Sequence, residues 1–389
     1  MNATSLPQEL IDMVIRGSAA DVPTLRSCSL VCRAFVPSSQ ACIFSVVALI
    51  PGLPTSCPRR LHDILVDSPH LGGHVRTLSV IEGIGAGRWL TDPNTSSAVL
   101  GILQHLKGVE SFSFSGRPWR DLPKELRAGV CNFCKRSHLV SLSLMSLGRF
   151  DDLREFSQLV ASPTLTRLTM QLVVLPAPDE GENTLTNPPK LRTCTCYLGH
   201  PTLAVITKWL VDGDVLPNLH TLSIMWNRDS DSQLQTMVNS LSSLHQLNLS
   251  VESSNSYFLF TLSLANLKRI QGVNITIATF TSLHTGVSVL IARIIESCPQ
   301  TLIDFEVKIN LYGRSLLEID WEPLRNVVTV EIFPALLNFQ VEAAPATDEG
   351  KENAHCLVKN IQSTFGDLHK QGILKCGMVP LVINPFAWT

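Results

Sequence analysis

The residues with the most obvious potential for chemistry are two cysteines and a histidine in the segment 131–138. Cys131 and Cys134 are separated by two residues and His138 follows, so three potential zinc ligands lie close together. A structural zinc site needs four ligands, and the chain has no second Cys-x-x-Cys pair. The segment is also predicted to form a helix just before a strand, where cysteine packs as a small apolar residue. We therefore favour helix packing over metal binding, and we expect no bound metal.

A second candidate is the glycine-rich segment 83–87, which follows a predicted strand as a nucleotide-binding loop would. Its sixth position is Arg88, where the dinucleotide fingerprint requires glycine, so an ordinary turn is favoured. The chain has no Gly-x-Ser-x-Gly elbow, no Walker A loop and no His-Glu-x-x-His motif. The sequence therefore predicts a protein that is not an enzyme and has no cofactor.

Composition limits the partners of the chain. The 389 residues are 45% hydrophobic and 16% charged, with a formal net charge of -2. Because a near-neutral chain does not attract polyanions over distance, we expect neither nucleic acid nor a membrane as a partner. No apolar run reaches the roughly 20 residues that span a bilayer, and Glu9 and Asp12 stand where a signal peptide would be apolar. Eleven cysteines are too few for a disulfide scaffold. We expect a soluble protein of the cytoplasm, the nucleus or both.

A six-residue pattern, apolar-x-x-apolar-x-apolar, recurs along the chain and indicates the elements that hold these side chains. The steps between copies are 23 to 35 residues, which is typical of stacked repeat proteins. The third and fifth positions are polar in all ten copies, whereas the fourth and sixth are apolar apart from Gly272. This alternation predicts strands with one wet face and one covered face. The copies begin at Val75, Val109, Leu139, Leu165, Leu191, Leu219, Leu244, Leu267, Leu302 and Val327.

The helices between the strands are predicted to cover the apolar face of the sheet. Strand, helix and strand running in one direction give a parallel sheet with helices on one side. His220 and His245 share the second position of adjacent repeats, so we expect stacked surface neighbours rather than a pair of metal ligands. Apolar residues fall at helical spacing in the sets Val99/Ile102/Leu103/Leu106, Leu153/Phe156/Leu159/Val160, Leu203/Ile206/Trp209/Leu210 and Leu290/Ile291/Ile294/Ile295.

This pattern resembles the strand motif of leucine-rich repeats, L-x-x-L-x-L-x-x-N/C-x-L, from about residue 75 to residue 335. The resemblance implies an α/β solenoid, a horseshoe with a parallel inner sheet and outer helices, that binds other proteins. A last helix over 357–369 and a last strand over 373–379 are expected to cap the stack. We expect 314–319 and 347–353 to be exposed insertions, the second of them a flexible loop.

The first fifty residues differ from the repeats, and they predict three short helices. These helices are too small to be comfortably stable alone, so they must pack on the repeats, on a partner or on both. The expected landmarks are a capping box of Ser5 and Gln8, a stop at Gly17 and Ser18, an N-cap at Asp21, Pro37 at the start of the third helix, and a strand-like run over 46–50.

Two segments in this region carry a more specific signal: Leu6-Pro7-Gln8-Glu9-Leu10-Ile11 and Leu25-Arg26-Ser27-Cys28-Ser29-Leu30-Val31-Cys32-Arg33-Ala34-Phe35. Together they resemble an F-box, closest to the F-box-like domain of a large fungal family. The downstream segment 67–71 is similar to the start of that family's repeats. The resemblance implies docking to the Skp-type adaptor of an SCF cullin–RING ubiquitin ligase, while the remaining chain captures a client protein.

Two sets of candidate site residues follow. The first set consists of apolar positions near the N-terminus, and its alternative role is a three-helix core of Leu10, Val14, Leu25 and Cys28. The second set consists of polar and charged positions on the strands, and its alternative role is an ordinary solvated sheet face. The resemblance implies adaptor-facing positions at Leu6, Pro7, Leu10, Ile11, Leu30, Val31, Cys32 and Phe35. The client-face candidates are Arg167, Gln246, Asn248, Arg269, Asp304, Glu306 and Glu331.

The sequence thus predicts an F-box-like three-helix domain (1–50), a connecting helix or linker (51–74), a leucine-rich-repeat-like solenoid with a C-terminal cap (75–379) and a tail (380–389). Its predicted function is substrate recognition in an SCF-type ubiquitin ligase, with a Skp-type adaptor and an unidentified client as partners. The alternative is a protein-interaction scaffold of the same fold with a vestigial F-box. Phe35 and Ser18 suggest this alternative, because the family usually has tryptophan at the first position and an apolar residue near the second.

Overall fold

The computed structural model describes residues 7–50, 57–82, 89–176, 189–226, 231–253, 262–279, 286–311, 319–345 and 348–380. Packing of the backbone divides the chain into two compact units. The first comprises Met1–Thr166 and Thr184–Pro189, and the second comprises Arg167–Asn183 and Lys190–Thr389.

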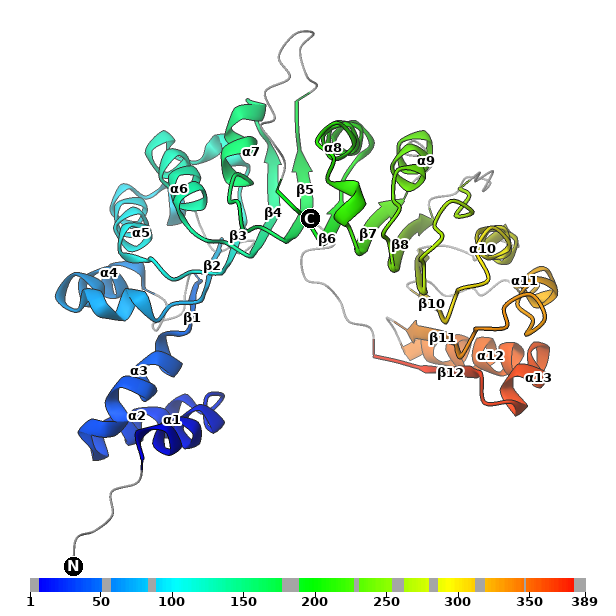
Figure 1. Ribbon diagram of the computed structural model, residues 1–389, viewed down its shortest axis with the longest axis horizontal. Helices are drawn as coiled ribbons and strands as arrows, with labels where there is room; N and C mark the ends of the chain where they lie inside the picture. Colours follow the sequence, from blue (N-terminus) through cyan, green and yellow to red (C-terminus); the bar gives the residue numbers. More distant parts are fainter. Residues whose placement is uncertain are drawn as a thin grey trace, which may run out of the picture. The chain divides into compact units, whose positions relative to one another are not determined.

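The first unit combines a short helical region with parallel strands. Each strand pairs with the next one along the chain, and the helices that follow the strands lie along one side of them (Figure 1). The strands are β1 (Val46–Leu49), β2 (Thr77–Ile81), β3 (Ser111–Ser115) and β4 (Ser141–Arg149). The helices are α1 (Gln8–Gly17), α2 (Val22–Val31), α3 (Val36–Phe44), α4 (Pro58–Asp67), α5 (Pro93–His105), α6 (Lys124–Arg136) and α7 (Leu153–Leu159). A short 3-10 turn, η1 (Arg33–Phe35), lies between α2 and α3, and another, η5 (Trp119–Asp121), lies between β3 and α6.

The second unit continues the same plan. Its strands also pair in parallel and in chain order. They are β5 (Arg167–Val174), β6 (Thr193–Tyr197), β7 (Thr221–Trp226), β8 (Gln246–Ser253), β9 (Gly272–Thr279), β10 (Asp304–Leu311), β11 (Asn338–Pro345) and β12 (Leu374–Met378). The helices are α8 (His200–Asp212), α9 (Asp231–Asn239), α10 (Gly286–Glu296), α11 (Glu322–Val327), α12 (Asp348–Thr364) and α13 (Gly366–Lys370).

The core lies between the strands and the helices, as the alternation predicts. On β2 to β11 the side chains in the fourth and sixth repeat positions are buried, for example Leu142 and Leu144 on β4. The third and fifth positions are half-exposed or exposed, apart from Ser223 and Gly272. The four helical sets of apolar residues are buried as well. An α/β architecture of parallel strands in chain order is therefore confirmed.

The eighth repeat begins three residues later than expected. Gly272 pairs with Gln246 on one side and with Asp304 on the other, which makes it a third-position residue rather than a buried sixth-position residue. The repeat therefore begins at Ile270, and Val273 and Ile275 fill its core positions. The prediction that began it at Leu267 is wrong, because glycine in the core position would have left a gap that Ile275 fills.

The tenth expected strand is also misplaced. Val327 ends α11, and the residues after it form a turn in which Val330 and Ile332 are exposed, although the prediction buried both. The strand is β11, which follows Leu336 and places Phe339 and Val341 in the core. This copy of the pattern fits the apolar and polar positions better than the copy at Val327 does.

The C-terminal cap is present, with one correction. The segment 347–353 was expected to be a flexible loop, but α12 begins at Asp348. Acidic residues in the first turn favour a helix N-terminus, and the buried residues Ala354, Leu357 and Ile361 continue the same helical face. The expected last strand is β12. Among the helices in the described ranges, none is both long enough and apolar enough to cross a bilayer.

The N-terminal landmarks agree with the structure except at the first helix. Asp21 caps α2 by accepting a hydrogen bond from the Thr24 amide at 3.1 Å, and the strand-like run 46–50 forms β1, which pairs with β2. The capping box is wrong: α1 starts after Pro7, with no side-chain cap, because the residue before a proline disfavours helical geometry. The expected features at Ser5, Leu6, 83–88 and 314–318 lie outside the described residues.

Candidate functional site

The three N-terminal helices pack around a very small core. Ile15 of α1 and Leu25 of α2 are buried, and α3 contacts both helices. The alternative core of Leu10, Val14, Leu25 and Cys28 is therefore correct for Leu25 alone, since Leu10 and Val14 are exposed and Cys28 is half-buried. Most apolar side chains of this three-helix region are therefore not fully buried.

Polar contacts hold these helices together. The Gln8 side-chain amide donates to Asp12 at 2.8 Å and to the carbonyl of Ala34 at 3.0 Å, and the Ser38 hydroxyl donates to Asp12. The Ser38 and Gln8 hydrogen bonds lower the pKa of Asp12 because they favour the carboxylate. The contact with Ala34 brings the start of α1 next to the segment that directly follows α2.

Exposed apolar side chains are concentrated on this helical region. Leu30 and Val31 at the end of α2 are 87% and 76% exposed, and on α1 Val14 is 67% and Leu10 is 45% exposed. Each such side chain loses roughly 1.5–3 kcal/mol of transfer free energy relative to burial. A group of exposed apolar residues on a small helical domain is typical of a protein interaction site.

Most of the predicted adaptor-facing residues belong to this exposed surface. Leu10, Leu30, Val31, Cys32 and Pro7 are exposed, and Ile11 and Phe35 are half-buried. Leu6 lies outside the described residues. We call the exposed and half-exposed residues Pro7, Leu10, Ile11, Met13, Val14, Leu30, Val31, Cys32 and Phe35 the N-terminal apolar surface. The structure adds Met13 and Val14 to the predicted set, and their three- and four-residue spacing from Leu10 is the sequence signal for them.

The second candidate surface is the wet face of the parallel strands. In the first unit it carries only small hydroxyl side chains at the third and fifth positions of β2 to β4, namely Thr77, Ser79, Ser111, Ser113, Ser141 and Ser143. In the second unit larger polar groups follow. The Asn248 amide donates to the Ser223 hydroxyl at 2.8 Å and the Gln246 amide donates to Asn248 at 3.2 Å, so side chains are ordered across β7 and β8.

Charged residues lie on the same face of β10 and β11. Lys308 and Glu342 form an ion pair at 3.9 Å. Glu306 shares this face, and its pKa is raised by partial burial and by Glu342, although Lys308 opposes the shift. Burial and a like charge both disfavour the ionised carboxylate. This end of the face therefore holds negative charge that its own cations compensate only in part.

Five of the seven client-face candidates lie on strands in the structure. Gln246, Asn248, Glu306 and Asp304 lie on the wet face, and Arg167 is exposed at the start of β5. Arg269 and Glu331 do not belong to it: Arg269 is in the turn before β9, and Glu331 is in the turn after α11. Both errors follow from the two misplaced repeats. Because the tenth strand was expected at Val327, Asn338, Gln340 and Glu342 were missed as residues of this face. The copy of the pattern that begins at Leu336 identifies them.

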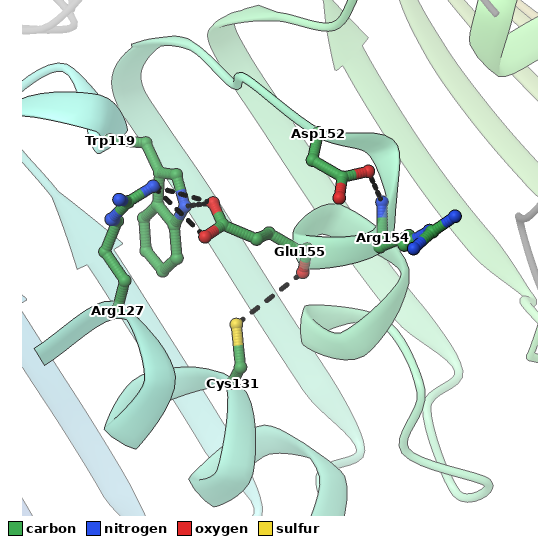
Figure 2. A network of polar contacts seen from close by, with 6 residues as sticks. All are labelled: Trp119, Arg127, Cys131, Asp152, Arg154 and Glu155. Carbon is green, nitrogen blue, oxygen red and sulfur yellow. Dashed lines mark hydrogen bonds and ion pairs between the residues drawn. The ribbon is translucent and has the colours of Figure 1, made fainter. Parts of the chain in front are cut away.

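Cys131 belongs to a polar network between helices, shown in Figure 2. The Trp119 indole donates to a carboxylate oxygen of Glu155 at 2.6 Å, and Arg127 donates to both oxygens at 3.0 and 3.1 Å. The Cys131 thiol contacts the backbone carbonyl of Glu155 at 3.6 Å. One carboxylate thus joins η5, α6 and α7.

Cys131 and Cys134 have the properties of core residues. Burial raises the pKa of Cys131 to about 12 and that of Cys134 well above its usual value, because an apolar interior disfavours the thiolate. His138 is exposed while Cys134 is buried. Within the part of the chain that the structure describes, no three His, Cys, Asp or Glu side chains are grouped so that they could hold a metal ion.

His220 and His245 are stacked neighbours, as predicted from their shared repeat position. Their ring centroids are 5.3 Å apart and the planes differ by 8°. The Nδ1 atoms lie 2.7 Å from the carbonyl oxygens of Asn218 and Ser243. Each Nδ1 therefore contacts the backbone carbonyl two residues before it, and the two rings lie face to face. This geometry favours stacking over metal coordination.

The geometry therefore provides two candidate interaction surfaces, one helical and apolar, the other a polar sheet face. Comparison with known proteins adds no family to this description: no protein-family model matches the chain, and no curated protein matches it.

Proposed function

We propose that this protein is the substrate-recognition subunit of an SCF-type cullin–RING ubiquitin ligase. In this role the N-terminal apolar surface binds a Skp-type adaptor, and the wet face of the strands binds the client protein. The protein carries out no chemistry itself.

The observation that carries the proposal is the exposure of apolar residues at the positions that the F-box resemblance assigns to the adaptor. Leu30 and Val31 are 87% and 76% exposed at the end of α2, and the Gln8–Ala34 contact holds the start of α1 beside the segment that follows α2. A helical domain that leaves its own core so small gains stability when a partner covers this surface.

The mechanism follows from proximity. A client held on the sheet face while the adaptor holds the N-terminal helices is kept near the ubiquitin carrier of the ligase. Tethering raises the effective concentration of the client's lysines, which accelerates transfer without a catalytic residue in this chain.

A scaffold of the same fold without ubiquitin function is the second candidate. Phe35 and Ser18 favour it, because the family usually has tryptophan in place of Phe35 and an apolar residue near Ser18 at the end of the first helix. In that case the sheet face would still bind a partner, but no adaptor would occupy the helices.

Co-purification with a Skp-type adaptor separates the two candidates. We expect the full chain to retain the co-expressed adaptor, and we expect the Leu6→Ala/Pro7→Ala variant to retain at least ten-fold less, because two apolar contacts worth about 1.4 kcal/mol or more are removed. The control is Val330→Ala/Leu337→Ala, which truncates two exposed apolar residues of the second unit and should retain the adaptor fully. Absence of adaptor on the unmodified chain would support the scaffold instead.

A further inference from the structure

The wet face of the second unit differs in chemistry from that of the first. The third and fifth positions carry hydroxyl side chains on β2 to β4, whereas in the second unit they carry Arg167 and hydroxyl side chains on β5 to β7, amides on β8 and β9 and carboxylates on β10. Because the strands follow chain order, these groups lie in a fixed sequence across β6 to β11. A fixed succession of different side chains is what an extended ligand can recognise.

The apolar part consists of two residues that break the polar pattern. Tyr197 ends β6, and Met225 lies near the end of β7 beside Ser250 of β8. Both are half-exposed at the position two residues beyond the fifth, where β8 to β11 carry the polar residues Ser250, Thr276, Lys308 and Glu342. A tyrosine with an adjacent methionine offers an aromatic and a deformable apolar contact, the types of residue that are enriched where proteins bind one another.

The middle of the face is flat and polar. Gly272 pairs with Gln246, and a side chain added at Gly272 would lie within 2.0 Å of the Gln246 side-chain oxygen. The glycine therefore leaves room for the amide, which together with Asn248 and Asn274 presents donors and acceptors along β8 and β9. A backbone laid across this region can form hydrogen bonds without a specific side chain.

The part of the face on β10 favours the binding of a positively charged group. Asp304 is exposed and Glu306 is half-buried on β10, and no ion pair to either carboxylate occurs among the residues that the structure describes. The nearby cations are Lys308, which pairs with Glu342, and Lys375 on β12 beside Gln340. A guanidinium or ammonium group placed against Asp304 and Glu306 would be attracted to both carboxylates and would relieve the repulsion between Glu306 and Glu342.

We propose that the sheet face of the second unit binds an extended, basic segment of the client, with one apolar side chain on Tyr197 and Met225 and two cationic side chains on Asp304 and Glu306. Three strand steps separate β7 from β10, which is about 14 Å at roughly 4.8 Å per step. Met225 aligns through Ser250 and Thr276 with Lys308, so Glu306 and Asp304 lie two and four residues closer to the start of their strand, and the direct separation is about 16–20 Å. An extended chain covers about 3.3 Å per residue, so the apolar residue and the basic pair lie roughly five to six residues apart. This inference rests on the proposed client-binding role of the same face.

Fluorescence anisotropy with two labelled probes tests the inference on the full chain. The probes are Phe-Gly-Ser-Gly-Ser-Arg-Arg and its reverse, Arg-Arg-Ser-Gly-Ser-Gly-Phe, each flanked by Gly-Ser. We expect saturable binding of at least one probe. The Asp304→Asn/Glu306→Gln variant should weaken it at least ten-fold, and the Tyr197→Ser/Met225→Ser variant should do the same.

The matched control is Asp212→Asn/Glu296→Gln, which makes the same change in net charge on α8 and α10, outside the sheet face. This variant should bind within two-fold of the unmodified chain. Failure of both probes to bind, or an equal loss in the control, would overturn the inference. Adaptor co-purification of the same variants is measured in parallel: loss of probe binding with the adaptor retained concerns this inference alone, whereas absence of the adaptor concerns the proposed function.

Discussion

Replacing Leu30 and Val31 with glutamine is expected to weaken adaptor binding at least 100-fold while leaving the protein folded. Both side chains are largely exposed at the end of α2, so the folded chain loses few internal contacts. Burial of each against a partner is worth roughly 1.5–3 kcal/mol, and the added amides would be desolvated without hydrogen bonds. The two losses together exceed the approximately 2.8 kcal/mol that corresponds to 100-fold.

Glutamine is chosen because it is neutral and compatible with a helix, so a change in net charge cannot explain the result. The measurement is the equilibrium dissociation constant with purified adaptor, and circular dichroism checks the fold. The Val330→Gln/Leu337→Gln variant makes the same chemical change on exposed residues elsewhere and should bind normally. Normal binding by the Leu30/Val31 variant would exclude the N-terminal apolar surface as the docking site.

The Glu155→Ala substitution is expected to destabilise the protein by about 2–4 kcal/mol. It removes the carboxylate that accepts hydrogen bonds from Trp119 and Arg127 (Figure 2). The Trp119 side chain is buried and the Arg127 side chain is 12% exposed, whereas that of Glu155 is 29% exposed. Loss of one partner of a buried ion pair costs about 3–5 kcal/mol, and the exposure of Glu155 reduces this figure through solvent screening.

Urea unfolding followed by circular dichroism measures the effect. Glu155→Gln keeps an oxygen for the Trp119 indole but loses the charge opposite Arg127, so it should cost less than Glu155→Ala. The control is Glu125→Gln, an exposed carboxylate on α6, with an expected change of about 0.5 kcal/mol or less. Equal stability of Glu155→Ala and the unmodified protein would show that the network does not hold these helices together.

Much of the repeat architecture could be predicted because its signal is carried by many positions at once. Alternation of residues such as Ser141, Leu142, Ser143 and Leu144 fixes which side of a strand is buried. Errors arose where two copies of the pattern overlap or compete. Gly272 indicates the first error, the misplaced eighth repeat, because glycine in a core position buries no side chain.

The second error has a different cause. The segment from Val327 to Ile332 has the pattern of a strand, yet Pro334 and Ala335 precede a better copy that begins at Leu336. Local pattern alone does not decide between them, because the register is set by pairing of β11 with β10. The loop expected over 347–353 is wrong for a related reason: Lys351 and Glu352 are exposed residues of α12, whose buried side includes Ala354 and Leu357.

The candidate surfaces were predictable to different degrees. The adaptor-facing positions came from a resemblance, and the structure adds the information that Leu10 and Val14 are not core residues. The network around Glu155 could not be predicted, because Trp119, Arg127 and Glu155 come from three elements and carry no shared spacing. Contacts of this kind depend on how neighbouring repeats stack rather than on any one segment.

Isothermal titration of the full chain with a purified Skp-type adaptor tests the central claim most directly. We expect one adaptor per chain, a dissociation constant of about 1 µM or tighter, and a negative heat-capacity change, since the N-terminal apolar surface would be removed from water. Absence of binding at an adaptor concentration of about 100 µM would contradict the account and leave the sheet face as the only interaction surface proposed for this protein.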